Sequence, residues 1–410
     1  MMINKWTFGL AAVGLVSLTP ALRADDKPSA VQTALANTTI SGYVSTSANV
    51  GLTDNYSQSL APVIPFQPTS KENGFNLDVV KLSISKPEDE SPWASGYQVD
   101  LLFGPDAVGY NTSVNSGSTA DYGIKQAYVT LRTPVGNGID WKIGVFDTVV
   151  GYEVFDPTGN ANYTRSWGYW MEPTEHTGVL ATYKVVDALS LSAGVANTSE
   201  AGINARNNQS GNPTGSDWHK TYLGSLTLTA PSSWGWAAGS ALNAGIVYGF
   251  NDNGYYNTVN TGNGTHADGN QVNYYVGLTA NTPWTPLTVG ASLDYVDNLF
   301  GGDDATYASA WAADAYATYK ATDKLSFSGR AEYVYGVYHE IGGTGLNDNN
   351  VEVTGTVEYD LWANVVSRLE VRWDHFLSLD DSNGYYLAEA IDPVAKGTAV
   401  GLYANLVFKF

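Results

Sequence analysis

The stretch 397–410, GTAVGLYANLVFKF, ends the chain and decides how the rest is interpreted. Small or polar residues alternate with an apolar set: Val400, Leu402, Ala404, Leu406, Phe408 and Phe410. Strict alternation predicts a β-strand with one apolar and one polar face. Because free chain ends usually fray into water, a strand that ends on an apolar-face aromatic suits a sheet closed by pairing with its first strand. The apolar face then meets lipid in a barrel, or a second sheet in a soluble β-sandwich.

The composition excludes several classes of protein. The 410 residues include no cysteine, and 20 Lys and Arg stand against 40 Asp and Glu. No disulfide framework can form, and such an acidic chain does not suit a nucleic-acid partner. No apolar run after the N-terminus is long enough for a membrane helix, but a barrel strand needs only about 9–11 residues.

The N-terminus predicts a secretory signal peptide over residues 1–24. Lys5 supplies its basic start, residues 8–18 its apolar core, and Ala24 a small residue before the cut. Residues 25–37 are polar and are expected to form a mobile lead-in. Residues 38–410 are predicted to be a single domain.

That domain repeats one pattern, in which two alternating segments flank a short turn and a long polar connection follows. The predicted strands are 38–52, 74–86, 94–103, 124–133, 139–146, 176–186, 188–198, 220–230, 236–251, 271–282, 287–297, 308–320, 325–338, 351–361, 365–376 and 397–410. About sixteen strands, with short and long connections in turn, are typical of a transmembrane antiparallel β-barrel with short periplasmic turns and long extracellular loops. A β-solenoid would need a fixed internal period, which is absent. We therefore predict an all-β outer-membrane barrel with a long third extracellular loop over 147–175.

Charged residues along the late strands indicate which face meets water. Leu369, Val371 and Trp373 alternate with charges, and each Arg or Lys would cost roughly 2–4 kcal/mol against lipid at mid-depth. These charges are therefore expected to line the lumen: Arg330, Glu332, Arg368, Glu370, Arg372 and Asp374. A barrel of about sixteen strands is wide enough for an aqueous channel.

The long third loop is the candidate constriction. Lys81, Arg132 and Lys142 share the polar register of early strands and would form a basic strip on one wall. If the loop folds into the lumen, its acids face that strip: Asp147, Glu153, Asp156, Glu172 and Glu175. Charges at such close range would select solutes, and Arg165 would lie on either side of the constriction. In the alternative, these charges only solvate a surface loop.

Four segments carry a family resemblance: 76–87 (NLDVVKLSISKP), 97–107 (YQVDLLFGPDA), 124–156, which begins IKQAYVTLRTPVGNGIDWKIG, and 162–183, which begins NYTRSWGYWMEPTEH. They resemble the outer-membrane β-barrel porin family described as porin-2, or OmpL-like. The resemblance implies a protein of the bacterial outer membrane in a Gram-negative type of envelope, surrounded by lipid. It also implies a channel for small hydrophilic solutes and ions, and porins of this size often assemble as homotrimers.

The favoured function is therefore passive diffusion through a water-filled pore, with cation preference from the acid excess. No enzymatic reaction and no cofactor are expected, and neither the histidines nor the Asp/Asn-rich loops show metal-site spacing. Two alternatives stay open. Trp167, Tyr169 and Trp170 would guide a sugar in a substrate-selective channel, or a blocked barrel would act as a structural or adhesive protein.

Overall fold

A computed structural model describes residues 37–53, 71, 73–110, 122–199, 202–204, 220–250, 270–298, 306–340, 346–378 and 398–410. The predicted signal peptide and most of the lead-in lie outside these residues. No helix among them is long and apolar enough to cross a membrane.

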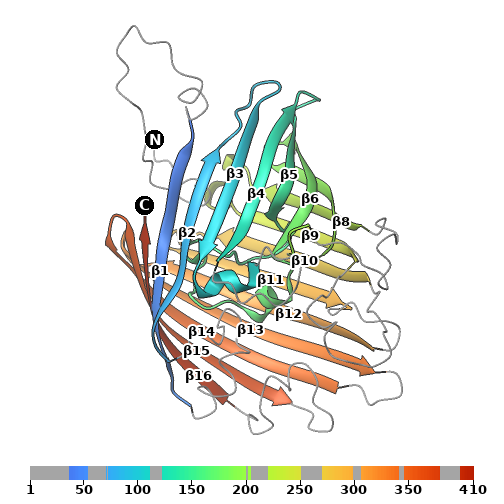
Figure 1. The fold of residues 1–410 in the computed structure, drawn as a ribbon. Helices are drawn as coiled ribbons and strands as arrows, with labels where there is room; N and C mark the ends of the chain where they lie inside the picture. The colour runs from blue at the N-terminus through green and yellow to red at the C-terminus, as the bar shows by residue number, and fades with distance from the viewer. Residues whose placement is uncertain are drawn as a thin grey trace.

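The chain forms a closed barrel of antiparallel strands in sequential order, as predicted (Figure 1). The strands are β1 (Thr39–Gly51), β2 (Gly74–Lys86), β3 (Ser95–Phe103), β4 (Tyr122–Thr133), β5 (Ile139–Asp147), β6 (Glu175–Val186), β7 (Leu189–Ala196), β8 (Thr221–Thr229), β9 (Ala241–Phe250), β10 (Asn270–Asn281), β11 (Leu287–Asp297), β12 (Thr306–Lys320), β13 (Leu325–Glu340), β14 (Leu346–Trp362), β15 (Val365–Ser378) and β16 (Thr398–Lys409).

The last strand closes the barrel against the first. β1 pairs with β16 from Tyr43–Lys409 to Gly51–Gly401. At the chain end, the Phe410 amide donates to the Gly42 carbonyl and the Gly42 amide donates to the Phe410 carbonyl, both over 3.0 Å. A Cβ at Gly42 would lie 2.8 Å from the Phe410 ring. The terminal aromatic therefore packs where β1 has no side chain.

Two predicted strand starts are wrong by five residues, and the strand placed at 351–361 begins already at Leu346. The strand placed at 236–251 begins only at Ala241, because residues Ser232–Ala237 form a short 3-10 helix, η6. This helix follows Pro231, and Gly235 has a φ of 61°. A left-handed backbone angle breaks an extended strand, so the aromatic residues there belong to a turn.

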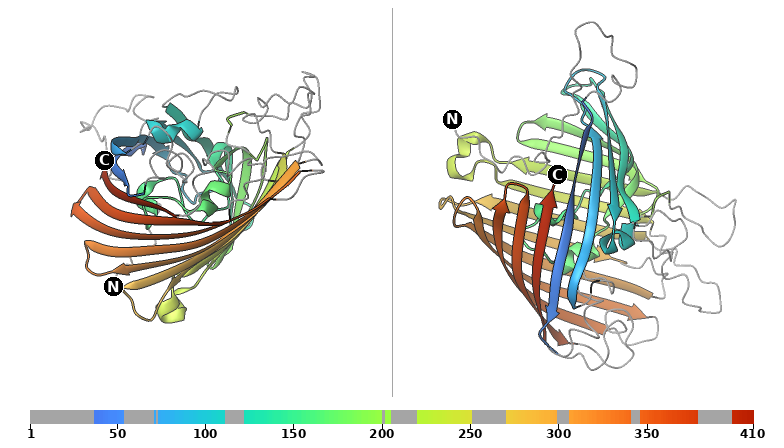
Figure 2. Two further views of the ribbon diagram at one scale, coloured as in Figure 1. Left: turned by 90° about the horizontal axis from the view of Figure 1, so that it is seen from below. Right: turned by 60° about the vertical axis from the view of Figure 1, so that its left-hand side comes forward.

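The two rims of the barrel differ. At one rim, neighbouring strands are joined by tight turns such as 187–188 and 363–364. At the other rim, the strand ends are joined by much longer segments of chain, such as 148–174 between β5 and β6 (Figure 2). This asymmetry is the one expected between the periplasmic and the extracellular rim.

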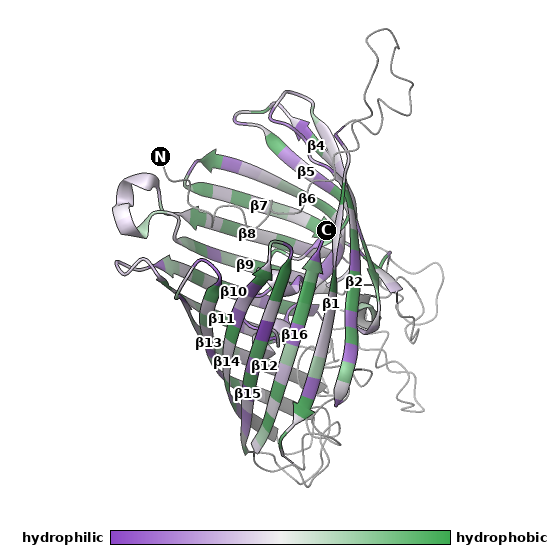
Figure 3. Cartoon of the chain, turned by 90° about the vertical axis from the view of Figure 1, so that its left-hand side faces the viewer, coloured by the Kyte–Doolittle hydropathy of each residue, from purple (hydrophilic) through white to green (hydrophobic). Residues whose placement is uncertain are grey.

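Hydrophobic and hydrophilic residues alternate along the strands (Figure 3), and on β15 the exposed fractions show that the apolar set faces outward and the polar set inward. Leu369 is 61 % exposed, whereas the next residue, Glu370, is 1 % exposed. Aromatic rings gather near both ends of the strands: Trp311 packs on Tyr333 at 5.3 Å, and Trp284 stacks on Tyr319 at 5.0 Å. Residues 311 and 319 are about 26 Å apart along one strand, which is about 20 Å along the barrel axis at a strand tilt of about 40°, close to the height of an outward apolar band of about 25 Å.

Two β-bulges place extra charges inside. The β1–β2 register shifts between Ser45 and Thr46, and the side chain of Asp78 turns inward to accept hydrogen bonds from Ser45 and Ser47. The β3–β4 register shifts beside Asp100, where Lys125 is the extra residue and is buried. A bulge opposes two residues to one, so strict alternation fails at both places.

Candidate functional site

The candidate site is the connection between β5 and β6, residues 148–174, here called the inner loop. It lies inside the ring of strands rather than above it (Figures 1 and 2). It contains a 3-10 turn, η4 (Pro157–Gly159), and a short helix, α2 (Trp167–Met171). The Ser166 side chain caps this helix by accepting from the Tyr169 amide. Its contacts, described below, reach strands on both sides of the lumen.

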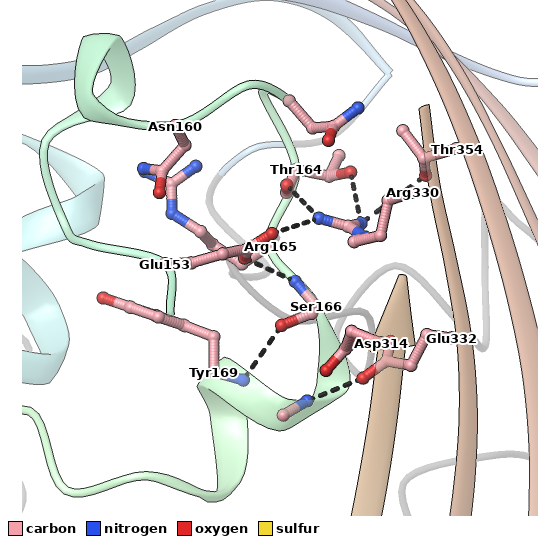
Figure 4. Close-up of polar contacts among 12 residues, drawn as sticks. Glu153, Asn160, Thr164, Arg165, Ser166, Tyr169, Asp314, Arg330, Glu332 and Thr354 are labelled. Carbon is pink, nitrogen blue, oxygen red and sulfur yellow. Dashed lines mark hydrogen bonds and ion pairs between the residues drawn. The ribbon is translucent and has the colours of Figure 1, made fainter. Parts of the chain in front are cut away.

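Arg165 fastens the inner loop to itself. Its guanidinium donates to the carbonyls of Val154 (3.0 Å), Tyr163 (2.7 Å) and Phe155 (2.7 Å). The residue is fully buried. Arg165, which was expected on either side of the constriction, lies within the loop itself, where its guanidinium joins the loop's two arms (Figure 4).

The wall of β13 binds the middle of the loop through one arginine and one glutamate. Arg330 donates to Glu153 at 2.7 Å and to the Thr164 carbonyl at 2.8 Å, while its Nε pairs with Glu352 at 2.9 Å. Glu332 accepts the amides of Trp167 (2.9 Å) and Gly168 (2.7 Å), the free N–H groups at the start of α2. Figure 4 shows both groups facing the loop.

β15, separated from β13 by β14, continues this row of contacts. Arg368 donates to the Pro157 carbonyl at 2.7 Å, and Glu370 accepts the Thr164 amide at 2.8 Å. Arg372 donates to the Arg165 carbonyl and pairs with Asp374, which accepts the Trp167 indole N–H at 2.9 Å. The inward register predicted for these charges is observed, but they face the loop rather than open water.

Beyond β16, which separates β15 from β1, the loop also reaches β1 and β2. Asp156 accepts from Lys81 at 2.9 Å and from the Tyr43 hydroxyl at 3.0 Å. Phe155 packs into an apolar cluster with Tyr43, Val79, Leu102, Ala107 and Val407. The loop is thus also fixed to β1 and β2, by an ion pair and by apolar burial.

The start of the loop packs on an apolar part of the lumen wall. Val150 belongs to an apolar cluster with inward-facing side chains from six successive strands: Phe146, Leu180, Ala196, Leu223, Val247 and Tyr275. Tyr152 follows and stacks on Tyr316 with ring centres 4.3 Å apart. This apolar filling shows that the lumen wall is polar only in part.

The end of the loop brings one carboxylate, Glu172, to two carboxylates of the wall. Glu172 lies beside Asp294 of β11, and a Cβ at Gly168 would lie 3.1 Å from Asp294 Oδ2 and 3.2 Å from Asp314 Oδ2 of β12. Burial, with the charge of Asp294 next in size, raises the pKa of the Glu172 carboxyl well above its ordinary value of 4.5. We call Glu172, Asp294 and Asp314 the acidic trio.

The predicted basic strip does not form as a unit. Of its three members, only Lys81 meets an acid of the loop. Arg132 pairs with Asp140 near a short turn, and Lys142 lies 4.9 Å from the centre of the Tyr128 ring. Arg132 and Lys142 lie on the paired strands β4 and β5, and each is held by a side chain of the other strand rather than by the loop.

The loop acids also find partners outside that strip. Asp147 pairs with Lys125 and Glu153 with Arg330 on the far wall. Glu175 is fully buried, and neither of its carboxylate oxygens has a hydrogen-bond partner among the described residues.

Sequence reasoning missed several inward charges, above all Lys125, Asp78, Asp294 and Asp314. Lys125 and Asp78 each stand where strict alternation would point them at lipid, which is itself a signal for a bulge. Asp294 and Asp314 alternate with apolar residues on β11 and β12, so the alternation that placed the charges of β15 in the lumen also predicts an inward position for these two. No group of three His, Asp or Glu among the described residues has the arrangement of a metal site.

Comparison with known proteins supports the architecture. The family described as "Putative beta-barrel porin-2, OmpL-like" matches residues 37–410. No curated protein matches the sequence. Among solved structures, OprB of Pseudomonas putida has a TM-score of 0.58 at 10% identity, with 93% of this chain and 96% of that chain covered.

Two further solved structures have the same fold. The trimer form of OmpT of Vibrio cholerae has a TM-score of 0.51 at 15% identity, covering 91% of this chain and 99% of that one. An anion-selective porin from Comamonas acidovorans has a TM-score of 0.52 at 10% identity, with the same coverage of 91% and 99%. At these identities the likeness shows the fold alone.

Proposed function

The chain belongs to the putative beta-barrel porin-2, OmpL-like family of the outer membrane, and from this premise we propose a diffusion channel narrowed by the inner loop. Small hydrophilic solutes and ions would cross it without any chemical reaction. The observation that carries the proposal is the row of wall charges that fixes the inner loop inside the barrel. A lumen-spanning segment held this firmly would set both the width and the charge of the passage.

We further propose a preference for cations. Arg330, Arg368 and Arg372 are neutralised by carboxylates of their own wall. The acidic trio has no Lys or Arg nitrogen within 4.0 Å among the described residues. The shared fold does not determine which ions pass, since an anion-selective porin has the same architecture. A homotrimer is proposed as well, supported by the trimer form of OmpT.

The test is single-channel current in a planar bilayer with a salt gradient across it. Steady ohmic current with a cation-selective reversal potential is expected. The double variant Glu172→Gln with Glu175→Gln should shift that potential toward zero, whereas Asp187→Asn at an exposed short turn should leave it unchanged. No current from correctly folded protein would favour a structural or adhesive barrel instead.

A second candidate is a channel selective for sugars. Trp170 of α2 is 44 % exposed inside a loop whose other tryptophan, Trp167, is buried against Asp374. An exposed indole offers a flat apolar face to a sugar ring. Liposome swelling with sugars of matched size would separate the candidates, because Trp170→Ala should slow the preferred sugar only if this face binds it.

A further inference from the structure

We propose that the acidic trio, together with the hydroxyl of Tyr316, binds the primary ammonium group of a small organic solute. This inference rests on the proposed channel function and names the class of cation that the channel would retain. The site lies between the end of the inner loop and the inner face of β10 to β12. Glu172 is partly exposed and gives access from the lumen.

Charge balance distinguishes this site from the other buried acids of the lumen. Asp100 and Asp374 each have a cation close by. Glu332 and Glu370 instead accept pairs of backbone amides from the inner loop. Glu175 lies in the field of Lys125.

Among the described residues, no member of the trio has a Lys or Arg nitrogen within 4.0 Å or accepts a pair of backbone amides, and Arg330 acts on Asp314 only from further away. Burying carboxylates without a counter-charge costs free energy. A bound proton or a bound cation must therefore neutralise the trio.

Unused hydrogen-bond acceptors favour a cation with several N–H groups. Asp314 is 5 % exposed; its Oδ2 accepts from Ser292 at 2.8 Å, but its Oδ1 has no partner among the described residues. The hydroxyl of Tyr316, 7 % exposed and two residues further on the same face of β12, has none either. A primary ammonium has three donors that rotate freely, which matches three carboxyl groups.

The surroundings suit an organic cation better than a metal ion. The arrangement of the described acids does not fit a metal. Ammonium N···O distances of about 2.7–2.9 Å exceed Ca²⁺–O distances of about 2.3–2.6 Å, so a wider set of oxygens suffices. The stacked rings of Tyr152 and Tyr316 border the site and offer aromatic faces to an alkyl ammonium.

The experiment measures block of potassium current by n-butylammonium chloride in planar bilayers at neutral pH. The wild-type channel should be blocked in a concentration-dependent way, whereas tetramethylammonium, which has the same charge and no N–H donor, should block far less. Asp314→Asn should weaken block by about tenfold, the usual effect of losing a hydrogen bond to a charged group. Asp360→Asn, near the short-turn rim, is the matched control and should leave the block by n-butylammonium unchanged.

Several outcomes would overturn this inference. Equal block by the two ammonium ions would show charge screening rather than N–H recognition. Unchanged block in Asp314→Asn would remove the site. A conductance that depends on pH without any ammonium block would show that protons neutralise the trio. If Asp314→Asn does not fold, Tyr316→Phe tests the same site, and equal block in it and the wild type counts against the proposal. Absence of potassium current in folded wild-type protein would instead refute the channel function.

Discussion

Gly168 shows how one residue governs the approach of the inner loop to the wall. Its amide binds Glu332, and its Cα faces two carboxylates so closely that a Cβ would lie 3.1 and 3.2 Å from their oxygens. Those atoms belong to short side chains on paired strands, so they have little room to move. A glycine is needed here for close approach, not for an unusual backbone angle.

Replacing Gly168 with Val should therefore lift α2 off β11 and β12. Overpacking of this kind typically costs about 1–3 kcal/mol, and the freed loop should be cleaved faster by protease added to proteoliposomes. Gly355→Val is the matched control, because a Cβ there meets no atom within 4 Å. Equal cleavage rates in the two variants would contradict the packing described.

The Glu172 carboxyl should make the docking of the loop depend on pH. Its pKa is raised in the docked state, so docking is fully favoured below its ordinary value of 4.5 and weakens as pH rises toward the raised value. Loop cleavage or current noise should accordingly increase with pH above about 4.5. Glu172→Gln should flatten this change, and an equally steep profile in that variant would show that another group is responsible.

At the scale of elements, the inner loop is a segment without much regular structure that is kept in place by strands. α2 has only five residues, too short to be stable alone. Its position comes from β13 and β15, whose inward charges receive its amides and carbonyls. The same alternation that makes these strands amphipathic thus also supplies a regular row of anchors for the loop.

Arg330 is the anchor with the largest expected effect. Arg330→Met would leave Glu153 and Glu352 buried without their common counter-charge, a loss of roughly 3–5 kcal/mol for a buried pair. We expect the loop to detach and single-channel current to become larger and noisier. Lys184→Met, which removes an exposed pair with Asp187, should change neither. Quiet currents in Arg330→Met would mean that the loop does not depend on this arginine.

At the scale of the whole molecule, the barrel combines a lipid-facing belt with a filled, charged interior. The belt is bounded by the aromatic rings near residues 311 and 319. Its apolar residues are exposed in the isolated chain, which suits lipid and not water. Closure by β16 leaves no free strand edge between its first and last strands.

Leu369→Arg tests which face meets lipid. Leu369 lies outside on β15 between the two rings, so an arginine there should lower the free energy of unfolding by about 2–4 kcal/mol. Thr318→Arg, on the lumen face of β12, should cost much less. Reversible denaturation in lipid vesicles measures both, and equal costs would contradict the assignment of the faces.

Sequence alternation alone was enough to predict the strands, the closure by Phe410, and the inward register of Arg368 to Asp374. Those features follow from local rules: side chains alternate along a strand, and lipid rejects charge. Only the tertiary structure decided where the bulges fall, and so that Asp78 and Lys125 point inward. It also decided which acid meets which base, because partners such as Glu153 and Arg330 lie far apart in sequence and are brought together by the path of the inner loop across the lumen. Alternation is a property of neighbours along the chain, whereas charge pairing depends on the closed shape of the whole barrel.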